Sequence, residues 1–441
     1  MVQQMKRALA ERSVAELSGL KGEPSWLLEK RLEAWRAYEA LPLPKPSDDV
    51  WRRTDLGRLK LEGFGAFTEP TPPVAEAHEL PAGLRSLARL DGARAGVAVQ
   101  ADSSAIFSAL SQELADKGII FTSLDRAVAD YPDLVRERLN SAVQPSENKF
   151  TALHSALWSG GVFLYVPRNV QVELPFHAIV HLSQTELGLF PHTLVVLEPG
   201  SSATLVEEHI SSELAATSFV SPLVESFIGE GAHLRYTNLV QWSEKVFTIG
   251  LQRNLLSRDA RVETMSVLLG GGVTKSHVES LLKEPGAHSD MLGIAFGGGS
   301  QHFDQYTLQD HQAPHTTSDL LYKAALRDKS RSIYYGLIHL QKPAQKAQAF
   351  QTNRNLILGD GARADSIPVL EIEADDVRCS HAAAVGPVDP EQLFYLMARG
   401  LDATSATRML VEGFFEPLVA RIPIEWVRQR LESWIHAKIG V

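Results

Sequence analysis

The pattern of apolar and polar residues changes twice along the chain, near residue 150 and near residue 389. Up to about residue 40, apolar residues such as Leu28, Leu32 and Trp35 recur at spacings of three and four, which is typical of amphipathic helices. Prolines at 42, 44 and 46 end this pattern, because proline fixes φ and removes a backbone donor. From there to residue 150 the mixed pattern predicts a small α/β region, with strands near 95–100 and short helices near 104–116 and 132–140.

Beyond residue 150, short alternating segments follow turns that are rich in glycine, aspartate and serine. Leu234 and Tyr236, for example, fall on one face of a strand, and His233 and Arg235 fall on the other. The turns span residues 198–203, 229–234, 257–262, 284–289, 327–332 and 359–364, and successive turns are 31, 28, 27, 43 and 32 residues apart.

A repeating unit of about 30 residues cannot bury its apolar face alone, so neighbouring units have to stack. Blades of a β-propeller need about 40 to 50 residues and four strands joined by hairpins, which is more than each step provides. We therefore predict a mainly β protein with a right-handed parallel β-helix over residues 151–388. The one long step predicts an insertion or an extra turn that contains residues 297–299.

Helical spacing returns after Asp389, which together with Pro390 forms a typical helix start. Gly400 predicts the end of this helix, Asp402 the cap of a second, and Pro423 the start of a third. The chain thus divides into an N-terminal helical and mixed α/β region (1–150), a β-helix core (151–388) and a C-terminal helical region (389–441). Apolar residues in the last region exceed the needs of a helical hairpin, so they either pack against the end of the solenoid or dock a partner protein.

Composition narrows the class of protein. Acidic residues outnumber basic ones, 53 to 43, which argues against a general affinity for nucleic acid or anionic membranes. Cys379 is the single cysteine, which excludes an internal disulfide, a Cys-x-x-Cys pair and a four-cysteine metal site built from this chain alone. The first residues lack the apolar core of a signal peptide, and no apolar run approaches the ~20 residues that cross a bilayer. We therefore expect a cytoplasmic protein.

Cys379 and His381 are the first candidates for chemistry. In an extended segment, residues two apart point to the same face, so the thiol and the imidazole would project side by side. Thiolate and imidazole suit iron, zinc or copper, but a complete metal site needs further ligands from another chain or from solvent. The alternatives are an inert buried cysteine beside a hydrogen-bonded histidine, and a cysteine nucleophile whose base the sequence does not reveal.

A second candidate is the segment 301–315, which holds three histidines and two aspartates. It lacks a recognised ligand spacing, so polar ladders on a solenoid surface explain it better than a metal site. The glycine runs 270–272 and 297–299 do not match a phosphate-binding loop. Because β-helices also carry carbohydrate-cleaving sites, a stand-alone carbohydrate enzyme is the alternative function, although the acidic residues are scattered and aromatic residues make up only 7%.

Several segments resemble one known family. Residues 351–360, 374–386 and 392–400 look like the C-terminal half of SufD, within the SufB/SufD family of the bacterial Suf iron-sulfur cluster assembly complex. Residues 311–323, 26–29 and 51–55 match as well, whereas residues 56–150 show little similarity. The triplet Cys379-Ser380-His381 resembles the SufD branch, because SufB tends to have a Glu-His pair at this position.

This resemblance implies a parallel β-helix and a function as a non-catalytic scaffold subunit. It implies that the C-terminal helices dock SufC, an ABC-type ATPase, and that the β-helix pairs with a SufB-like paralogue or, in isolation, with a second copy. The position of His381 is thought to act with a partner cysteine where iron enters and the nascent cluster forms. Cys379 belongs to the same triplet without a fixed role, and no cofactor is expected to be bound stably.

Overall fold

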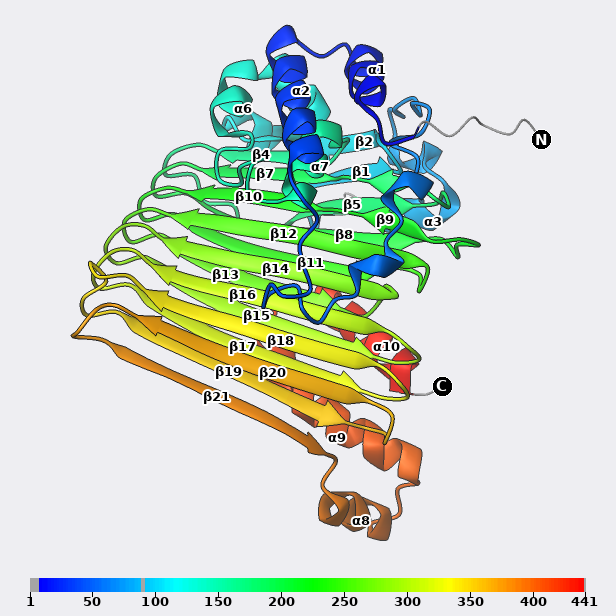
Figure 1. The fold of residues 1–441 in the computed structure, drawn as a ribbon, viewed down its shortest axis with the longest axis vertical. Helices are drawn as coiled ribbons and strands as arrows, with labels where there is room; N and C mark the ends of the chain where they lie inside the picture. Colours follow the sequence, from blue (N-terminus) through cyan, green and yellow to red (C-terminus); the bar gives the residue numbers. More distant parts are fainter. Residues whose placement is uncertain (1–7, 89–91, 440–441) are drawn as a thin grey trace.

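Two parallel sheets stacked face to face dominate the computed structural model, which describes residues 8–88 and 92–439 (Figure 1). The first sheet contains, in spatial order, β2 (Ser104–Leu110), β1 (Gly96–Ala101), β5 (Phe176–Leu182), β8 (Ser202–Ser211), β11 (His233–Gln241), β13 (Arg261–Leu268), β15 (His288–Gly297), β17 (Thr317–Leu326), β19 (Gln348–Ile357) and β21 (Arg378–Pro387). The second contains β20 (Arg363–Ile372), β18 (Arg331–Leu340), β16 (His302–His311), β14 (Val273–Leu282), β12 (Val246–Leu256), β10 (Leu223–Ile228), β7 (His192–Leu197), β4 (Val162–Val166) and β3 (Ile120–Ser123), with β6 (Gly188–Leu189) and β9 (Ser218–Val220) beside this path.

From β10 onward, consecutive strands alternate between the two sheets, so each coil there contributes one strand to each sheet. This arrangement is a β-solenoid of about eight coils, as the turn repeat predicts. Side chains alternate along every strand, and one set fills the space between the sheets, which we call the lumen. Ala203, Leu234 and Val262 occupy equivalent lumen-facing positions on β8, β11 and β13 and are buried.

The turns that lead from the second sheet to the first share one backbone feature. Each contains a residue in the left-handed region, and these residues are 31, 28, 27, 29 and 31 positions apart: Gly200, Gly231, Asp259, Gly286, His315 and Lys346. The N–H of Gly200 donates to Glu230 of the next coil (2.8 Å), and the N–H of His315 donates to Gln345 (3.0 Å). The turns therefore stack through backbone hydrogen bonds as well as through the strands.

Of the insertion and the extra turn predicted at residues 297–299, the insertion is wrong, whereas the chain does turn at Gly298 and Gly299. The turns at 327–332 and 359–364 lie at the opposite edge of the solenoid, where the chain passes from the first sheet to the second. The step of 43 residues therefore joins turns of two different edges. Gly298 and Gly299 form the ordinary turn between β15 and β16, and the next turn of the first series contains His315.

The N-terminal region adds three strands to the sheets and several short helices. The helices are α1 (Glu11–Lys21), α2 (Ser25–Ala40), α3 (Ala82–Arg85), α4 (Gln112–Asp116), α5 (Leu124–Asp130), α6 (Pro132–Arg138) and α7 (Lys149–Leu157), with short 3-10 turns at Leu56–Arg58, Leu61–Gly63 and Ala77–Glu79. The helical prediction up to residue 40 is confirmed for α1 and α2, and its first seven residues lie outside the described part. Strand β1 and helix α6 confirm two further predictions.

The helix predicted at 104–116 is wrong over its first half, because residues 104–110 form strand β2 antiparallel to β1. Asp102 allows this hairpin by adopting a positive φ of 49°. Its carboxylate accepts hydrogen bonds from the backbone N–H and the hydroxyl of Ser183, both at 2.7 Å. The contact with Ser183, 81 positions away, thus favours the strand at 104–110, which the local spacing of apolar residues does not predict.

Helices α1, α2 and α7 cover the first coils and close that end of the solenoid (Figure 1). Arg31 is fully buried in this cover; its guanidinium donates to both carboxylate oxygens of Glu23 at 2.8 and 2.7 Å and stacks on Trp158. The bidentate pair satisfies a charge that would otherwise be costly in the interior. The predicted region boundaries at 150 and 388 stay a prediction.

The C-terminal region forms α8 (Pro390–Ala398), α9 (Ala403–Val419) and α10 (Glu425–Ile439). The caps are as predicted: Asp389 accepts from the N–H of Glu391, and Asp402 from that of Ser405. Helices α9 and α10 pack their apolar faces against the outer face of the first sheet, not against the end of the solenoid. The final coil is consequently left open (Figure 1).

Candidate functional site

The triplet that contains Cys379 and His381 begins β21, the last strand of the first sheet. Strand β20 ends at Ile372, and a turn precedes the triplet. In the parallel register, Cys379 lies opposite Ala349 and His381 opposite Gln351. Both of these partners on β19 are buried, so Cys379 and His381 share the face of β21 that points to the lumen. The predicted side-by-side arrangement is therefore compatible with the strand.

Cys379 is half-buried and packs against the apolar group of Ile338, Leu340 and Ala349. Burial raises the pKa of its thiol to about 11. The isolated chain therefore keeps Cys379 protonated near neutral pH, and a protonated thiol is neither a good nucleophile nor a metal ligand. These surroundings favour the interpretation of an inert thiol over that of a cysteine nucleophile.

His381, in contrast, is exposed at the open end. Its register partner on β19 is Gln351, whose Oε1 has no hydrogen-bond partner among the described protein groups. Within residues 8–88 and 92–439, no group of three or more His, Cys, Asp and Glu side chains is arranged to hold a metal ion. A ligand bound at His381 would therefore need donors that do not come from these residues.

The open end is also an unpaired edge of both sheets. Strands β20 and β21 are the last of their sheets in the part of the chain that the structure describes, so one side of each keeps its backbone donors and acceptors unpaired by a further strand. Large apolar side chains are exposed around this edge, namely Phe350, Ile372 and Val385. Monomeric proteins rarely leave such an edge uncovered, and the combination is typical of an association surface.

The histidines of segment 301–315 do not converge. His302 begins β16, His311 ends it, and His315 occupies the left-handed position of a turn. His311 is buried in the lumen, where its Nδ1 lies 2.7 Å from Thr316 Oγ1 and its Nε2 lies 2.8 Å from Ser318 Oγ. Burial lowers its pKa to about 3, so the ring is neutral and structural. The preference for a structural function over a metal site is consistent with this arrangement, but the predicted position on the solenoid surface is wrong for His311, which is buried.

Asp304 of the same segment anchors a distant part of the chain, which the sequence pattern did not reveal. Lys275 Nζ donates to Asp304 at 2.9 Å and to the carbonyl of Val50 at 2.6 Å, while the Thr54 hydroxyl also donates to Asp304. The ring of Trp51 covers the Lys275 ammonium. Residues 50–54, the strap, are thus fastened to the outer face of the second sheet by a buried ion pair.

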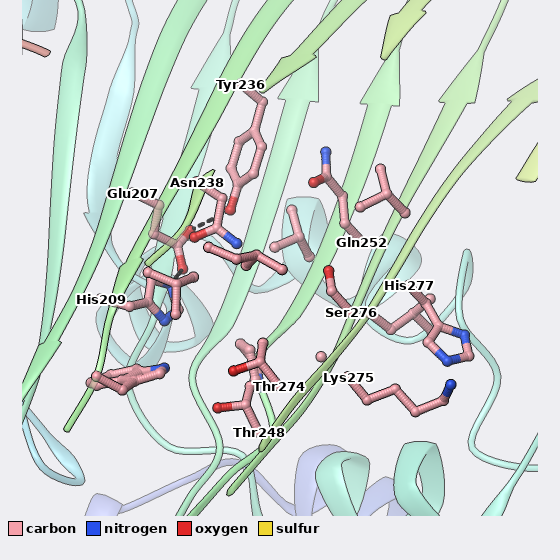
Figure 2. A pocket seen from close by; sticks show the side chains of 18 residues that line it. Glu207, His209, Tyr236, Asn238, Thr248, Gln252, Thr274, Lys275, Ser276 and His277 are labelled. Atoms are coloured by element: carbon pink, nitrogen blue, oxygen red, sulfur yellow. Dashed lines mark hydrogen bonds and ion pairs between the residues drawn. The ribbon is translucent and has the colours of Figure 1, made fainter. Parts of the chain in front are cut away.

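A polar group inside the lumen was also missed. Figure 2 shows the ring of His209 and the hydroxyl of Tyr236 directed at the carboxylate of Glu207, at 2.7 and 3.0 Å, and Thr193 completes the set at 2.7 Å. Burial alone would raise the pKa of Glu207, but these three hydrogen bonds hold it below its ordinary value. The sequence signal that could have revealed this group is the spacing of Glu207 and His209, which are two residues apart on β8 and therefore share one face.

The adjoining cavity, of about 30 Å³, is lined by residues of both sheets (Figure 2). His209 Nδ1, Asn238 Oδ1 and Thr248 Oγ1 line it without partners among the described groups. A volume of this size holds one or two water molecules, and water can bond all three atoms. The interior cavity therefore has room for water and is too small for an organic substrate.

Comparisons with known proteins agree with this architecture. Residues 180–414 match the family described as "SUF system FeS cluster assembly, SufBD core domain", and residues 20–177 match "SufBD protein N-terminal region". The chain belongs to the SufBD family. Relatives described as iron-sulfur cluster assembly SufBD family proteins include those of Staphylococcus saprophyticus (32% identity), S. epidermidis (33%) and S. aureus (32%). Each alignment covers 429 residues, which is 96% of this chain and 91% of the relative.

Membership of the SufBD family places the protein in iron-sulfur cluster assembly. At 32% identity these relatives do not distinguish the SufB from the SufD branch. Within the part that the structure describes, none of the helices combines the length and the apolar character required to cross a bilayer.

A further surface of this SufBD protein lies on the C-terminal helices. Phe394 of α8 exposes 73% of its surface, and Tyr395, Met397 and Met409 are also exposed. Figure 1 shows α8 beyond the last coil, away from the face that α9 and α10 cover. Aromatic and methionine side chains grouped in this way are typical of protein-binding surfaces. This group, here called the α8 patch, is separate from the open edge of β20 and β21.

Proposed function

We propose that this chain is the SufD-type, non-catalytic scaffold subunit of a cytoplasmic SufB-SufC-SufD complex. The observation that carries the proposal is the open last coil, where Cys379 and His381 begin the edge strand of a solenoid that is closed at its other end. The Cys-Ser-His triplet supports the SufD branch. No observation among the described residues favours the alternative of a stand-alone carbohydrate enzyme.

The partner at the open end is a SufB-like chain or, in its absence, a second copy. The unpaired edges of β20 and β21 can add strands of a partner, and Ile372 and Val385 supply apolar area for the contact. Such an interface brings His381 close to donor groups of the other chain. The other chain can then supply the remaining metal ligands, because the described residues of this chain do not form a complete ligand set.

His381 binds iron transiently at that interface, where the nascent cluster forms. A neutral imidazole offers a lone pair to iron, and protonation removes it, so histidine suits an ion that must be passed on. Cys379 contributes as a ligand only if the partner or the metal lowers the pKa of its thiol, which burial raises in the isolated chain. Iron and the nascent cluster are substrates here and are not stably bound cofactors.

The α8 patch is the surface for a SufC-like ATPase. Its exposed Phe394, Tyr395 and Met397 offer apolar anchors, and the patch lies on the helices that follow the edge strand β21 directly. Movement of the ATPase would therefore act on α8 and, through it, on the open end. Such coupling requires that the ATPase contact α8 differently in its two nucleotide states.

Affinity capture tests the partner assignments. The intact chain should recover an ABC-type ATPase and a SufB-like protein, and a chain that ends at Val388 should lose the ATPase and keep the SufB-like protein. The SufB-like protein should retain the contact because β20 and β21 are intact. Recovery of the intact chain alone, together with turnover of a substrate by that chain, would contradict the scaffold function.

The His381→Ala variant tests the function of the imidazole. It should assemble into the complex normally but fail to support maturation of iron-sulfur enzymes in a strain that depends on it. Ser380→Ala is the matched control, because residue 380 points to the opposite face of β21 and should leave maturation unchanged. Normal maturation with His381→Ala would overturn the assignment.

A further inference from the structure

A groove of about 730 Å³ lies where the last turn of α10 meets the edge of the solenoid. Its floor consists of the turns after β11, β13, β15 and β17, and its walls are residues 210–214 and the end of α10. Trp434 and Lys438 of α10 line it together with Gln301. The groove is separate from both the open end with His381 and the α8 patch.

Lys438 stands out among the charged residues of the groove. Its Nζ donates to the side-chain oxygen of Gln301 at 2.6 Å and lies 5.9 Å from the centre of the Phe296 ring. No carboxylate lies within ion-pair distance of this amine among the described residues. The neighbour of the ammonium is thus a neutral amide, which stabilises its charge less than a carboxylate would.

The other charged groups around the amine come from three elements. Glu244 and Lys245 belong to the turn after β11, and Arg327 and Asp328 to the turn after β17, while Glu213 lies in the wall. Burial and the Arg327 charge lower the pKa of Lys438, Glu244 and Asp328 oppose them, and the resulting pKa is about 8. A substantial fraction of the amine is therefore unprotonated at the pH of a cell.

The arrangement is that of a nucleophilic lysine in an open groove. We propose that Lys438 is a site of Nε-acylation by small, uncharged acyl thioesters. The amine nitrogen attacks the thioester carbonyl carbon, the carbon–sulfur bond breaks with its electron pair leaving on sulfur, and the nitrogen loses a proton that the thiolate takes up. The products are an amide on Lys438 and a free thiol, and no oxidant or metal is consumed.

The charges of the groove select the class of acyl donor. Three acidic and three basic side chains line it, so with Lys438 unprotonated the groove carries a net negative charge. Acyl phosphates are anionic and are repelled, whereas an uncharged thioester is not. The acyl group would also remove the hydrogen bond from Lys438 to Gln301, which fastens the end of α10 to the turn after β15. This inference does not depend on the proposed function.

The test uses the full-length chain and an uncharged acetyl thioester, N,S-diacetylcysteamine, with site-resolved mass spectrometry at pH 7.5. Lys245 is the matched control, because it lines the same groove and is exposed. Lys438 should be acetylated on the order of ten-fold faster than Lys245, and acetyl phosphate at equal concentration should not reproduce the preference. Equal or slower labelling of Lys438 would overturn the proposal.

A surface variant provides an independent measurement. Glu244→Gln removes a carboxylate that raises the pKa of Lys438 and alters only an exposed turn, so the fold is retained. Labelling of Lys438 at pH 7 should become severalfold faster, and labelling of an exposed lysine outside the groove, Lys117, should not change. An unchanged rate at Lys438 would show that its reactivity does not arise from the groove and would contradict the proposal.

Discussion

The hydroxyl of Thr54 donates a hydrogen bond to the carboxylate of Asp304, a residue 250 positions further along the chain. Through this bond and the Lys275–Asp304 ion pair, the strap joins the N-terminal region to the middle of the second sheet. Two segments that appear unrelated in the sequence, residues 51–55 and 301–315, therefore form one structural unit.

Replacing Thr54 by Val removes the hydroxyl but preserves the shape of the side chain. We expect a loss of about 1–2 kcal/mol in the free energy of unfolding, because the buried Asp304 carboxylate loses one donor. Urea unfolding measures this change. Ser86→Ala, which removes an exposed hydroxyl, is the control and should have little effect. Equal midpoints for Thr54→Val and the wild type would show that the Thr54–Asp304 hydrogen bond does not contribute to stability.

Asp304→Ala should be more severe than Thr54→Val, because it leaves the Lys275 ammonium buried without its counter-ion. Removing one partner of a buried pair costs about 3–5 kcal/mol. Burial already lowers the pKa of Lys275, and the carboxylate opposes that effect. Thermal unfolding should show the difference, and the double variant Asp304→Ala with Lys275→Met should recover part of the loss. Absence of any recovery would mean that the ion pair is not the cause.

The stacked turns predict a difference between two glycines. Gly231 and Gly286 both have a positive φ, so alanine at either position costs roughly 1 kcal/mol. A Cβ at Gly231 would meet open space, whereas at Gly286 it would overlap the Asp259 carboxylate. Gly286→Ala should therefore destabilise the protein by about 1–3 kcal/mol more than Gly231→Ala in urea unfolding. Similar values for both variants would contradict the stacking of these turns.

Stability should fall in mild acid because of His311. Its pKa is about 3 in the folded protein, against 6.5 without burial. Below pH 6.5 the unfolded chain binds a proton that the folded chain does not, so stability is lost by at most ~1.4 kcal/mol per pH unit as the pH falls towards 3. The free energy of unfolding of the wild type and of His311→Gln should be measured at pH 8 and pH 5. Between these two pH values the wild type should lose more stability than the variant. If the free energies of unfolding of the two proteins changed equally with pH, a neutral buried His311 would be excluded.

The two proposed protein interfaces can be separated by charge substitutions. Phe394→Glu on the α8 patch should abolish capture of the ATPase and leave the SufB-like partner bound, because 73% of the Phe394 surface is exposed and the substitution does not disturb the fold. Val385→Glu at the open edge should have the opposite effect. Each variant is the control for the other in the same co-purification. Loss of both partners in either variant would contradict two separate surfaces.

Much of this architecture is predictable from the sequence because its signals are local. Alternation along each strand, and aspartate caps such as Asp389 and Asp402, depend on neighbouring residues only. The same-face relation of Cys379 and His381 follows from strand geometry alone. The exact turn series was harder to predict, because its left-handed positions hold Gly, Asp, His and Lys and not glycine throughout.

Contacts between distant residues set the limit of prediction. The strand at 104–110 depends on Asp102 and Ser183, and the strap depends on Thr54 and Asp304. Neither relationship leaves a periodic trace in the chain. The groove around Lys438 likewise needs α10 to lie on the first sheet, whereas the sequence offered the end of the solenoid as an alternative position.

The two ends of the solenoid differ, because helices cover its first coils and the strands of its last coil are uncovered. A stack of coils that was open at both ends could add further molecules without limit and grow into a filament. Here α2 and α7 cover one end, so two solenoids that meet through their open ends leave no open coil for a third solenoid. Pairing through open ends is thus limited to two solenoids by the N-terminal helices, far from the contact itself.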